Sequence, residues 1–283
     1  MKLTATTQWF TLWQSRVFHP RLSHHPPWDQ VMKLRRCISI FAIALVGCVL
    51  GNGPNAFGQA EVADGFQSLF NGTDLSGWVI PEGDGGHWKV VDGVIDYDAM
   101  SEASGDKNLK TEQEFTDFIL KIDWRLKQTT GLMDIPVVLS DGTYLTDRSG
   151  NKITIKRPNA DSGVYLRGDS RAQLNIWCWP IGSGEVYGHR NNPKTPPEIR
   201  AALTPRLNAD KPVGQWNRFE IILVDDRVTV MLNDQLVLEN AQLPGLPEKG
   251  PIVLQHHGGM RDGEYSPASS LIQFKNIWIK PLD

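Results

Sequence analysis

The sequence predicts an all-β domain of the sandwich or barrel type. Three observations support this prediction: apolar and polar residues alternate over many short segments, turn dipeptides separate those segments, and no segment has a long helical period. The segment DFILKIDWRLK (117–127) shows the pattern most clearly, because its even positions are apolar and most of its odd positions are polar. Many short strands at regular spacing are typical of two packed sheets or a closed barrel.

The expected strands follow the same alternation along the chain. They are residues 117–127, 163–167, 173–177, 216–224, 227–232, 235–238, 251–257 and 271–280. Turn pairs such as Asp92-Gly93, Asp141-Gly142 and Asn233-Asp234 separate chain segments. Two segments interrupt this order: residues 128–160 predict a hairpin insertion, and the proline-rich residues 193–212 predict one helical turn at 197–203. We therefore expect a single domain over residues 64–283.

The N-terminal region predicts export. Lys33, Arg35 and Arg36 precede the apolar run CISIFAIALVGCVL, which is too short to span a membrane comfortably. A basic segment followed by a short apolar run and small residues is typical of a secretory signal. A transmembrane anchor is the alternative interpretation.

Two processing points fit this signal. LVGC, ending at Cys48, resembles a lipobox whose cysteine would be lipidated, whereas GQA, ending at Ala60, resembles an ordinary signal-peptidase site. Met32 begins a normal signal sequence, so we interpret residues 1–31 as an upstream extension and residues 32–60 as the signal. The mature protein is then periplasmic, extracellular or anchored by a lipid at Cys48.

The charge of the remaining chain argues against nucleic acid as a partner. Residues 61–283 carry 23 Lys and Arg against 31 Asp and Glu, a net charge of −8, and have no basic run that would neutralise phosphates. Cys178 is the only cysteine after the signal, so an internal disulfide is excluded. A lone cysteine among tryptophans is usually a small buried apolar residue.

Several motifs occur in an order that resembles a known family. They are FQSLFNGTDLSGW (66–78), HWKVVDGVI (87–95), DFILKIDWRL (117–126), ADSGVYLRG (160–168), GQWNRFEI (214–221), VMLNDQLV (230–237), GPIVLQHHGG (250–259) and IQFKNIWIKPL (272–282). Together they resemble the 3-keto-disaccharide hydrolase domain family over essentially the whole mature chain. The resemblance implies a concanavalin-like jelly roll of two antiparallel sheets.

The resemblance also implies chemistry on glycosides whose sugar carries a ketone at C3. The ketone acidifies the hydrogen at C2, so that a modest base removes it, the aglycone leaves C1 by β-elimination, and water can add back. Such a reaction needs a base, a group that stabilises the enolate and an acid for the leaving oxygen. It does not need the paired carboxylates of ordinary glycosidases.

The sequence departs from the family pattern at two positions. Many members have an acidic residue two positions before the strand glutamine, where this chain has Arg171 before Gln173. The arginine that often precedes the final NI pair is Lys275 here. Any role of the missing acidic residue is therefore in doubt for this chain.

The strand QLNIW (173–177) predicts a sugar-binding face. In a jelly roll one side of a front strand is core and the other faces ligand, so Leu174 and Ile176 are expected inside. Gln173, Asn175 and Trp177 then share the ligand side, where an indole covers a sugar ring and amides bind hydroxyls. A solvated polar face, with the tryptophan covering a loop, is the alternative.

Residues 251–257 place two histidines next to each other. Adjacent residues of a strand point to opposite faces, so Gln255 and His257 share one face and His256 lies on the other. The family pattern LQ-x-HG selects Gln255 and His257, and His257 becomes the candidate catalytic base. For His256 a structural role is expected.

Other polar residues of the strands are weaker candidates for substrate binding. Tyr165 and Arg167 alternate with apolar residues, and Arg167 would polarise the ketone or pair with an acid. Asp123 and Arg125 share the polar face of their strand, and surface pairing explains them equally well. Asp161 is expected to cap a turn.

The glycine-rich loop that follows residue 177 contributes the remaining catalytic candidates. Glu185, His189 and Arg190 lie just beyond the strand end, and loops on a rigid sandwich often carry catalytic groups. Glu185 and His189 are therefore a candidate acid and base, and an ordinary polar loop is the alternative. No cofactor is required by these motifs, although His189, His257 and a carboxylate could hold a divalent metal.

Two other functions stay open at this point. A non-catalytic carbohydrate-binding module could use the same scaffold, because a fold does not fix a function. A conventional glycosidase would need two suitably separated carboxylates on one face, and no such pair is obvious in the sequence.

Overall fold

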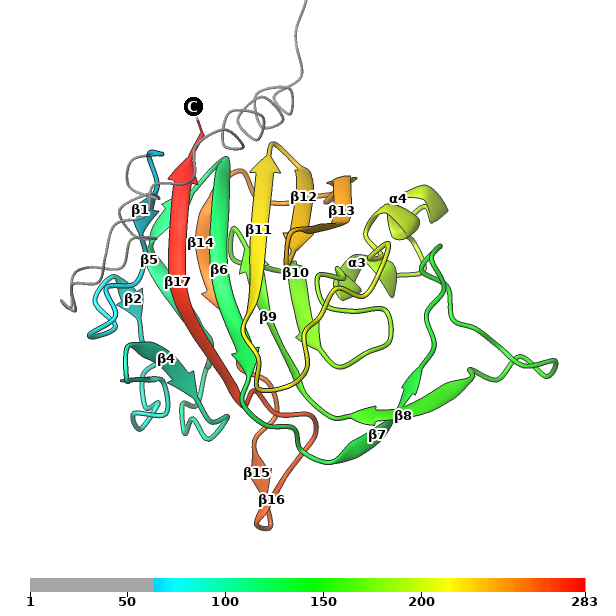
Figure 1. The fold of residues 1–283 in the computed structure, drawn as a ribbon, viewed down its shortest axis with the longest axis horizontal. Helices are drawn as coiled ribbons and strands as arrows, with labels where there is room; N and C mark the ends of the chain where they lie inside the picture. Colours follow the sequence, from blue (N-terminus) through cyan, green and yellow to red (C-terminus); the bar gives the residue numbers. More distant parts are fainter. Residues whose placement is uncertain (1–63, 283) are drawn as a thin grey trace, which may run out of the picture. The chain divides into compact units, whose positions relative to one another are not determined.

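A computed structural model describes residues 64–282 of the chain, and these residues form two antiparallel β-sheets packed face to face (Figure 1). The predicted all-β, jelly-roll sandwich is confirmed. The predicted signal, Cys48 and Ala60 lie outside the described residues. Among residues 64–282, no helix is long and apolar enough to cross a membrane.

The larger sheet has eight strands in the order β13-β12-β11-β6-β17-β4-β3, with β1 paired to β17. Its strands are β1 (Gln67–Ser68), β3 (Lys89–Val91), β4 (Val94–Tyr97), β6 (Phe118–Leu126), β11 (Asn217–Val224), β12 (Arg227–Leu232), β13 (Gln235–Gln242) and β17 (Ile272–Pro281). Strand β6 lies in its centre and pairs with β11 on one side and β17 on the other.

The smaller sheet has five strands in the order β10-β9-β14-β5-β2. These are β2 (Trp78–Val79), β5 (Leu109–Phe115), β9 (Asp161–Leu166), β10 (Asp169–Trp177) and β14 (Gly250–Leu254). In Figure 1 this sheet lies behind the larger one. Strand β10 forms one of its edges, which matters for the site described below.

The core between the sheets is built from the alternation seen in the sequence. The apolar residues of β6 at even positions, from Phe118 to Leu126, are all buried in one cluster with Leu174, Ile176 and Leu254 of the facing sheet. Burial of one such side chain contributes about 1.5–3 kcal/mol. In β9, β10 and β14 of the smaller sheet the even-numbered apolar residues face this core, so the odd-numbered residues point away from it, and the candidate site residues are found there.

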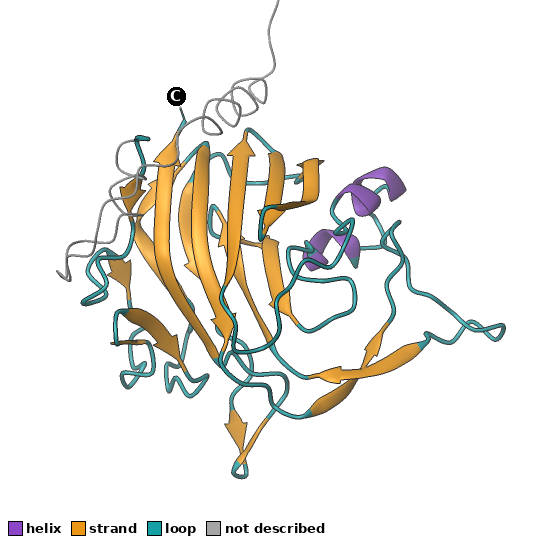
Figure 2. Ribbon diagram, viewed as in Figure 1, coloured by secondary structure: helices purple, strands orange, loops and turns teal. Residues whose placement is uncertain are grey.

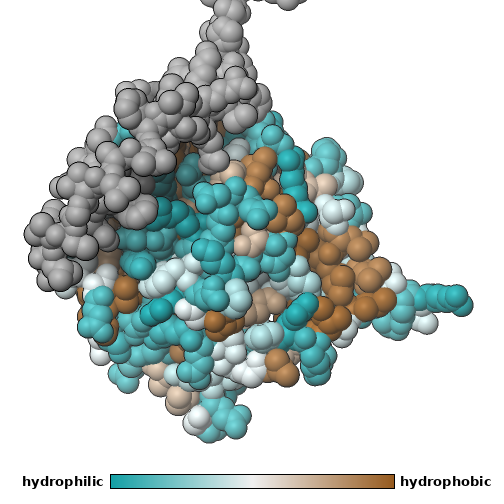
Figure 3. All heavy atoms as spheres, in the orientation of Figure 1, coloured by the Kyte–Doolittle hydropathy of each residue, from teal (hydrophilic) through white to brown (hydrophobic). Residues whose placement is uncertain are grey.

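The predicted hairpin insertion is present. It contains β7 (Leu132–Pro136) paired with β8 (Thr154–Pro158), followed outward by two isolated bridges. It exposes the apolar residues Leu132, Leu139 and Ile153, and Figure 3 shows hydrophobic residues gathered on the side of the visible face where the insertion lies. Two short helices adjoin it, α3 (Tyr187–Arg190) and α4 (Pro197–Ala202), drawn purple in Figure 2. Helix α4 confirms the predicted helical turn.

Two details differ from the sequence prediction. Strand β14 ends at Leu254, so the two histidines follow the strand instead of lying within it. The polar strand β5 and the small hairpin of β15 (Met260–Arg261) and β16 (Glu264–Tyr265) have weak alternation and were not expected. Strand β5 forms because its neighbours β14 and β2 supply hydrogen-bond partners.

Candidate active site

The outer face of the five-stranded sheet carries a network of amide side chains. Gln173 Nε2 donates to Gln255 Oε1 at 2.6 Å and to Asn175 Oδ1 at 2.7 Å. Tyr165, opposite Gln173 on β9, is also on this face, and its side chain is hydrogen-bonded to Gln255. The predicted grouping of Gln173, Asn175, Tyr165 and Gln255 is thus present in the structure.

A glycine makes room for this network. Gly163 lies on β9 close to Gln173, and a Cβ atom at this position would clash with the Gln173 side chain. Any larger residue would push the Gln173 amide out of its position. The SG pair of the motif therefore positions an amide in the site.

His257 lies at the end of β14 and is held by the loop that leads into β17. Its Nδ1 donates to the carbonyl of Ala268 at 2.6 Å, and its own carbonyl accepts from Ser270 N at 3.0 Å. Because Nδ1 carries the hydrogen in this bond, the neutral imidazole keeps its lone pair on Nε2. Gly258 has φ 69° and leaves no room for a Cβ atom beside Ala268, so a glycine is required after the histidine.

Asp161 faces the free nitrogen of His257. The distance between Asp161 Oδ2 and His257 Nε2 is 3.7 Å, and the two side chains are 24% and 32% exposed, so both are open to a ligand. Burial raises the pKa of Asp161 to about 6, against the opposing effect of His257. Its Oδ1 is buried without a hydrogen-bond partner in the described part of the chain.

Glu185 reaches the same face from the loop after β10. Backbone hydrogen bonds join Gly184 and Glu185 to Asn175, so this loop continues the sheet beyond its edge strand. The Glu185 carboxylate forms an ion pair with Arg190, and neither side chain is exposed. Burial raises the pKa of Glu185 to about 7, although Arg190 opposes the shift and Asp161 adds to it.

Because Glu185 is sealed from solvent, it cannot touch a substrate in this structure. Arg190 is in turn covered by Tyr144 of the insertion and by Tyr187, with ring centroids 4.9 and 5.2 Å from its guanidinium carbon. The role of Glu185 as an acid stays a prediction, and in this structure its carboxylate is held by Arg190.

His189, the other loop candidate, does not join the site. It is 6% exposed, and its pKa is lowered by burial and by Arg171, with Asp169 opposing. The helical turn of α3 directs it toward the start of β10, whereas His257 follows the end of β14. A metal shared by His189 and His257 has no support here, and no group of three potential ligands converges anywhere in residues 64–282.

Arg167, Asp123 and Arg125 are also absent from the site. Arg167 is buried in the turn between β9 and β10, where it donates to the carbonyl of Thr116 and pairs with Asp117. Asp123 and Arg125 lie on the outer face of the larger sheet, where Asp123 pairs with Arg218. A sandwich has two polar outer faces, and alternation alone does not distinguish between them.

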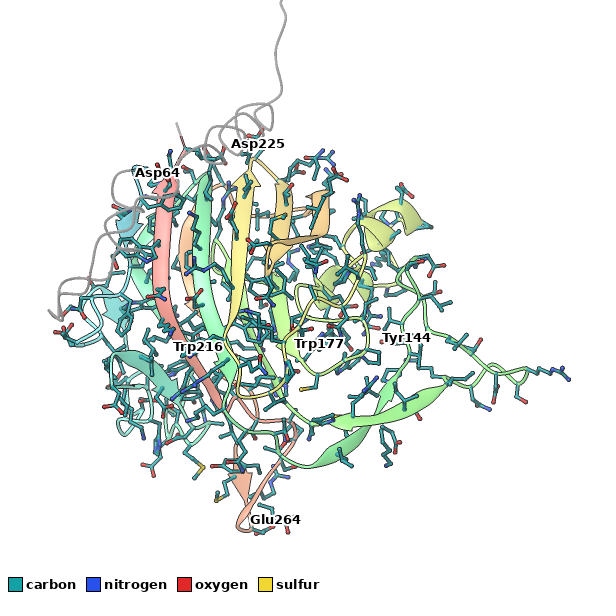
Figure 4. The ribbon with its side chains drawn as sticks, viewed as in Figure 1. Asp64, Tyr144, Trp177, Trp216, Asp225 and Glu264 are labelled. Carbon is teal, nitrogen blue, oxygen red and sulfur yellow. The ribbon has the colours of Figure 1, made fainter. Side chains whose placement is uncertain are left out.

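Trp177 shares its strand face with Gln173 and Asn175, but it is not an open platform. It is 4% exposed, its ring stacks on Trp179 at 4.2 Å, and its Nε1 donates to the carbonyl of Gly182 at 2.8 Å. Figure 4 labels Trp177 near the end of β10 and Tyr144 on the insertion. The more exposed partner of this aromatic pair is Trp179.

His256 has the structural role expected of it. It points to the core side of the sheet, where Nδ1 is hydrogen-bonded to the hydroxyl of the fully buried Tyr97. Burial and the charges of Lys107 and His257 lower its pKa to about 4, so it stays neutral near pH 7.

Comparison with known proteins agrees with this fold. The family model of the 3-keto-alpha-glucoside-1,2-lyase-like domain matches residues 65–280. The chain belongs to this family. The expected resemblance is thus confirmed, and a carbohydrate-related function follows from the family.

The chain is similar to several solved structures, and the first of them supports the fold. A proposed glycosyl hydrolase from Parabacteroides distasonis ATCC 8503 is 22% identical, with a TM-score of 0.51 over 77% of this chain and 84% of that chain. A second proposed glycosyl hydrolase from the same organism is 20% identical, with a TM-score of 0.49 over 83% and 99% of the two chains. The carbohydrate-binding module CBM66 from Bacillus subtilis is 13% identical, with a TM-score of 0.37 over 72% and 95%. No curated protein sequence matches the chain.

The position where many family members have an acidic residue carries a surface ion pair in this chain. Arg171 pairs with Asp169 at 2.7 Å and also donates to the carbonyl of Gly245. This pair lies beside His189 rather than beside His257. The accessible acid of this face is Asp161.

Asp161 is the site residue that sequence reasoning missed. From the sequence it is expected only to cap a turn. The signal was its spacing, since Asp161 is two residues before Gly163 and four before Tyr165 and therefore shares their face.

Proposed function

We propose that this protein cleaves 3-keto-glycosides at the anomeric bond, with His257 as the base and Asp161 as the acid. The observation that carries the proposal is the geometry of this pair. His257 has its Nδ1 engaged by a carbonyl and its Nε2 directed to a half-open carboxylate. A base with a fixed tautomer beside an acid of raised pKa suits proton abstraction next to a ketone.

The reaction would proceed by elimination. His257 Nε2 takes the proton from C2, and the electrons of that bond form the enolate of the C3 ketone. When the enolate collapses, a double bond forms between C1 and C2 and the bond from C1 to the leaving oxygen breaks. Protonated Asp161 or the imidazolium of His257 supplies the proton to that oxygen, and addition of water across the double bond completes a net hydrolysis.

The amide network would hold the sugar during these steps. Gln173 and Gln255 orient each other and present polar atoms on the sheet face. Burial raises the pKa of Tyr165 to about 12, so its hydroxyl stays neutral and remains a hydrogen-bond donor. Such neutral donors stabilise an enolate oxygen without an added charge.

The same geometry argues against a conventional glycosidase. Such an enzyme needs two carboxylates that both reach the substrate. Asp161 and Glu185 influence each other electrostatically, but Glu185 is fully buried in its ion pair with Arg190. Only Asp161 of the two is open to a ligand.

The test compares turnover of a 3-keto-disaccharide with turnover of the same disaccharide before oxidation. We expect cleavage of the first only, and His257→Gln should lower its turnover by on the order of 10²-fold or more, with a much smaller loss of binding. His87→Gln is a matched control, because His87 also contacts a carboxylate, at 2.9 Å from Asp98, but lies outside the site.

Three outcomes would contradict the proposal. Near-normal turnover by the His257 variant would remove its role as base. Cleavage of the unoxidised sugar at the same rate would favour a glycosidase. Binding of the sugar without any cleavage would favour a carbohydrate-binding module, the function to which the replacement of the acidic residue by Arg171 also points.

We also propose that the protein is exported and acts in the periplasm, outside the cell or on a lipid anchor at Cys48. Support comes from the basic and apolar run at residues 33–50, which precedes the described domain.

A further inference from the structure

The amide network of the candidate site has a fixed direction, which starts at a backbone carbonyl. Asn175 Nδ2 donates to the carbonyl of Glu185 at 3.1 Å. A carbonyl only accepts hydrogen bonds, so the nitrogen of the Asn175 amide must lie on this side and Oδ1 on the other. Asn175 is only 4% exposed, and its orientation is therefore set by the protein and not by solvent.

The direction passes from Asn175 to Gln173. Gln173 Nε2 donates to Asn175 Oδ1 at 2.7 Å, and a second backbone acceptor, the carbonyl of Ser162, lies 3.2 Å from the same nitrogen. Both acceptors require the nitrogen of the Gln173 amide at this position. Its other short hydrogen bond, at 2.6 Å, goes to Gln255 Oε1. An amide nitrogen has two hydrogens, and the two short bonds use both.

The last step of the network determines where the hydroxyl hydrogen of Tyr165 points. Because Gln255 Oε1 accepts from Gln173, Nε2 of the same amide is left as the donor. Burial raises the pKa of Tyr165, and the hydrogen bond with Gln255 opposes that rise, as a donor to the phenol oxygen does. Tyr165 Oη thus accepts from the protein, and its own hydrogen remains available to a ligand.

Tyr165 and the proposed base lie on opposite sides of the amide network. Asp161, Gly163 and Tyr165 follow one another on the outer face of β9, with about 7 Å between neighbours along the strand. His257 faces Asp161 at one end of this line, and Gln255 N donates to the carbonyl of Gly163 in its middle. Tyr165 forms the other end and is 9% exposed. A sugar ring over the amides therefore has His257 on one side and the Tyr165 hydroxyl on the other.

We propose that Tyr165 is a catalytic residue that donates its hydroxyl hydrogen to the C3 ketone oxygen, and that the amide network positions this hydrogen. The inference rests on the function proposed above, to which it adds the orientation of the sugar. A ring whose bond from C2 to C3 runs along β9 presents its C2 hydrogen to His257 and its ketone to Tyr165. As the electrons of the broken C2–H bond move onto the ketone oxygen, Tyr165 keeps its proton and shares it with the enolate.

The first test removes the hydroxyl or reverses the last hydrogen bond of the network. Tyr165→Phe removes the donor, whereas Gln255→Glu keeps the acceptor for Gln173 and offers Tyr165 a carboxylate oxygen, which takes the hydroxyl hydrogen away from the substrate. Each variant should lower kcat for a 3-keto-disaccharide by on the order of 10²-fold, with a much smaller change in KM. The double variant should lose no more than Tyr165→Phe alone, because without the hydroxyl the direction of the Gln255 amide no longer matters.

The matched control for the charge is Gln235→Glu. It makes the same substitution in an exposed residue at the start of β13, in the larger sheet, and should keep the wild-type kcat.

The second test observes the ketone directly. The probe is 1,5-anhydro-3-keto-D-glucitol labelled with carbon-13 at C3, which has no aglycone to lose. A directed donor in a desolvated site polarises a ketone more than water does. The C3 resonance of the probe bound to the wild-type protein should therefore lie downfield of that of the free probe, a measurement that involves no folding risk. This displacement should be lost in Tyr165→Phe and in Gln255→Glu and kept in Gln235→Glu.

The outcomes distinguish this inference from the proposed function. If the wild type cleaves no 3-keto-glycoside but the downfield displacement depends on Tyr165 and Gln255, the proposed function is wrong and the assignment of the donor holds. If cleavage depends on His257 but the wild type does not bind the probe or shows no displacement, the inference is overturned and the proposed function stands. A wild-type kcat in Tyr165→Phe or in Gln255→Glu would overturn it as well.

Discussion

Replacing Asp161 by asparagine should change how the stability of this protein depends on pH. Burial raises the pKa of the Asp161 carboxyl from 3.8 to about 6 in the folded chain. Between these two values the folded state binds more protons than the unfolded state, so the free energy of unfolding falls as the pH rises. The stabilising contribution is fully present below about pH 4 and is lost as the pH passes through 6.

The size of this effect follows from the shift. A difference of about two pKa units corresponds to about 3 kcal/mol of unfolding free energy, at about 1.4 kcal/mol for each unit. Asparagine has no proton to lose and keeps nearly the same shape. The difference in unfolding free energy between Asp161→Asn and the wild type should therefore grow by about 2 kcal/mol between pH 4.5 and pH 7.5.

The assay is urea denaturation of both proteins at intervals of half a pH unit. Asp134→Asn is the control, because Asp134 is exposed on β7 and its pair with Lys156 is a surface contact. Parallel pH profiles for the wild type and Asp161→Asn would refute the reasoning, since they would show that folding leaves the Asp161 carboxyl unperturbed. Loss of turnover in the same variant would agree with its proposed role as acid.

Three further predictions concern other parts of the chain. Glu185→Gln should lower the unfolding free energy at pH 8 by about 3–5 kcal/mol, because it leaves a buried guanidinium unpaired. As a control, Glu239→Gln removes an exposed ion pair and should lower the unfolding free energy by less than about 1 kcal/mol in the same denaturation assay. Equal losses of unfolding free energy in the two variants would contradict the value expected for Glu185→Gln. Gly163→Ala should displace Gln173 and lower kcat/KM by on the order of tenfold to a hundredfold without unfolding the protein. Unchanged kinetics would show that the Gln173 amide does not contribute to the reaction. Cys48→Ala should release the exported protein from the membrane fraction of a bacterial host, and continued attachment would exclude the lipid anchor.

The fold was predictable because its strands are half-buried. Alternation in the segment 117–127 and at Leu174 and Ile176 reflects the core directly, and these side chains are fully or almost fully buried in the structure. Strand β5 was missed because Thr111 and Gln113 are polar residues on the same face as Leu109 and Phe115, and pairing with β14 and β2 defines the strand instead. That pairing joins residues far apart in the sequence, which a local pattern does not contain.

The site was less predictable for two physical reasons. The alternation of residues along a strand separates its two faces, so it grouped Gln173 with Asn175 and His257 with Gln255 correctly. It does not say which sheet a strand joins, so it left open whether Asp123 and Arg125 face a ligand or form surface pairs; they lie on the outer face of the larger sheet. The alternation also does not report burial. The side chains of Glu185 and Trp177 are buried by the loop after β10.

The hydrogen bonds between Asn175 and the loop at Gly184 and Glu185 also affect the tendency of the protein to self-associate. An open strand edge invites another chain to add to it, and β10 is the edge strand nearest the site. The loop occupies the backbone groups of Asn175 and therefore hinders the addition of another chain to this edge, which would lead to aggregation. Variants that release the loop should form oligomers at high concentration before they lose their core, and size-exclusion chromatography of Glu185→Gln would detect them.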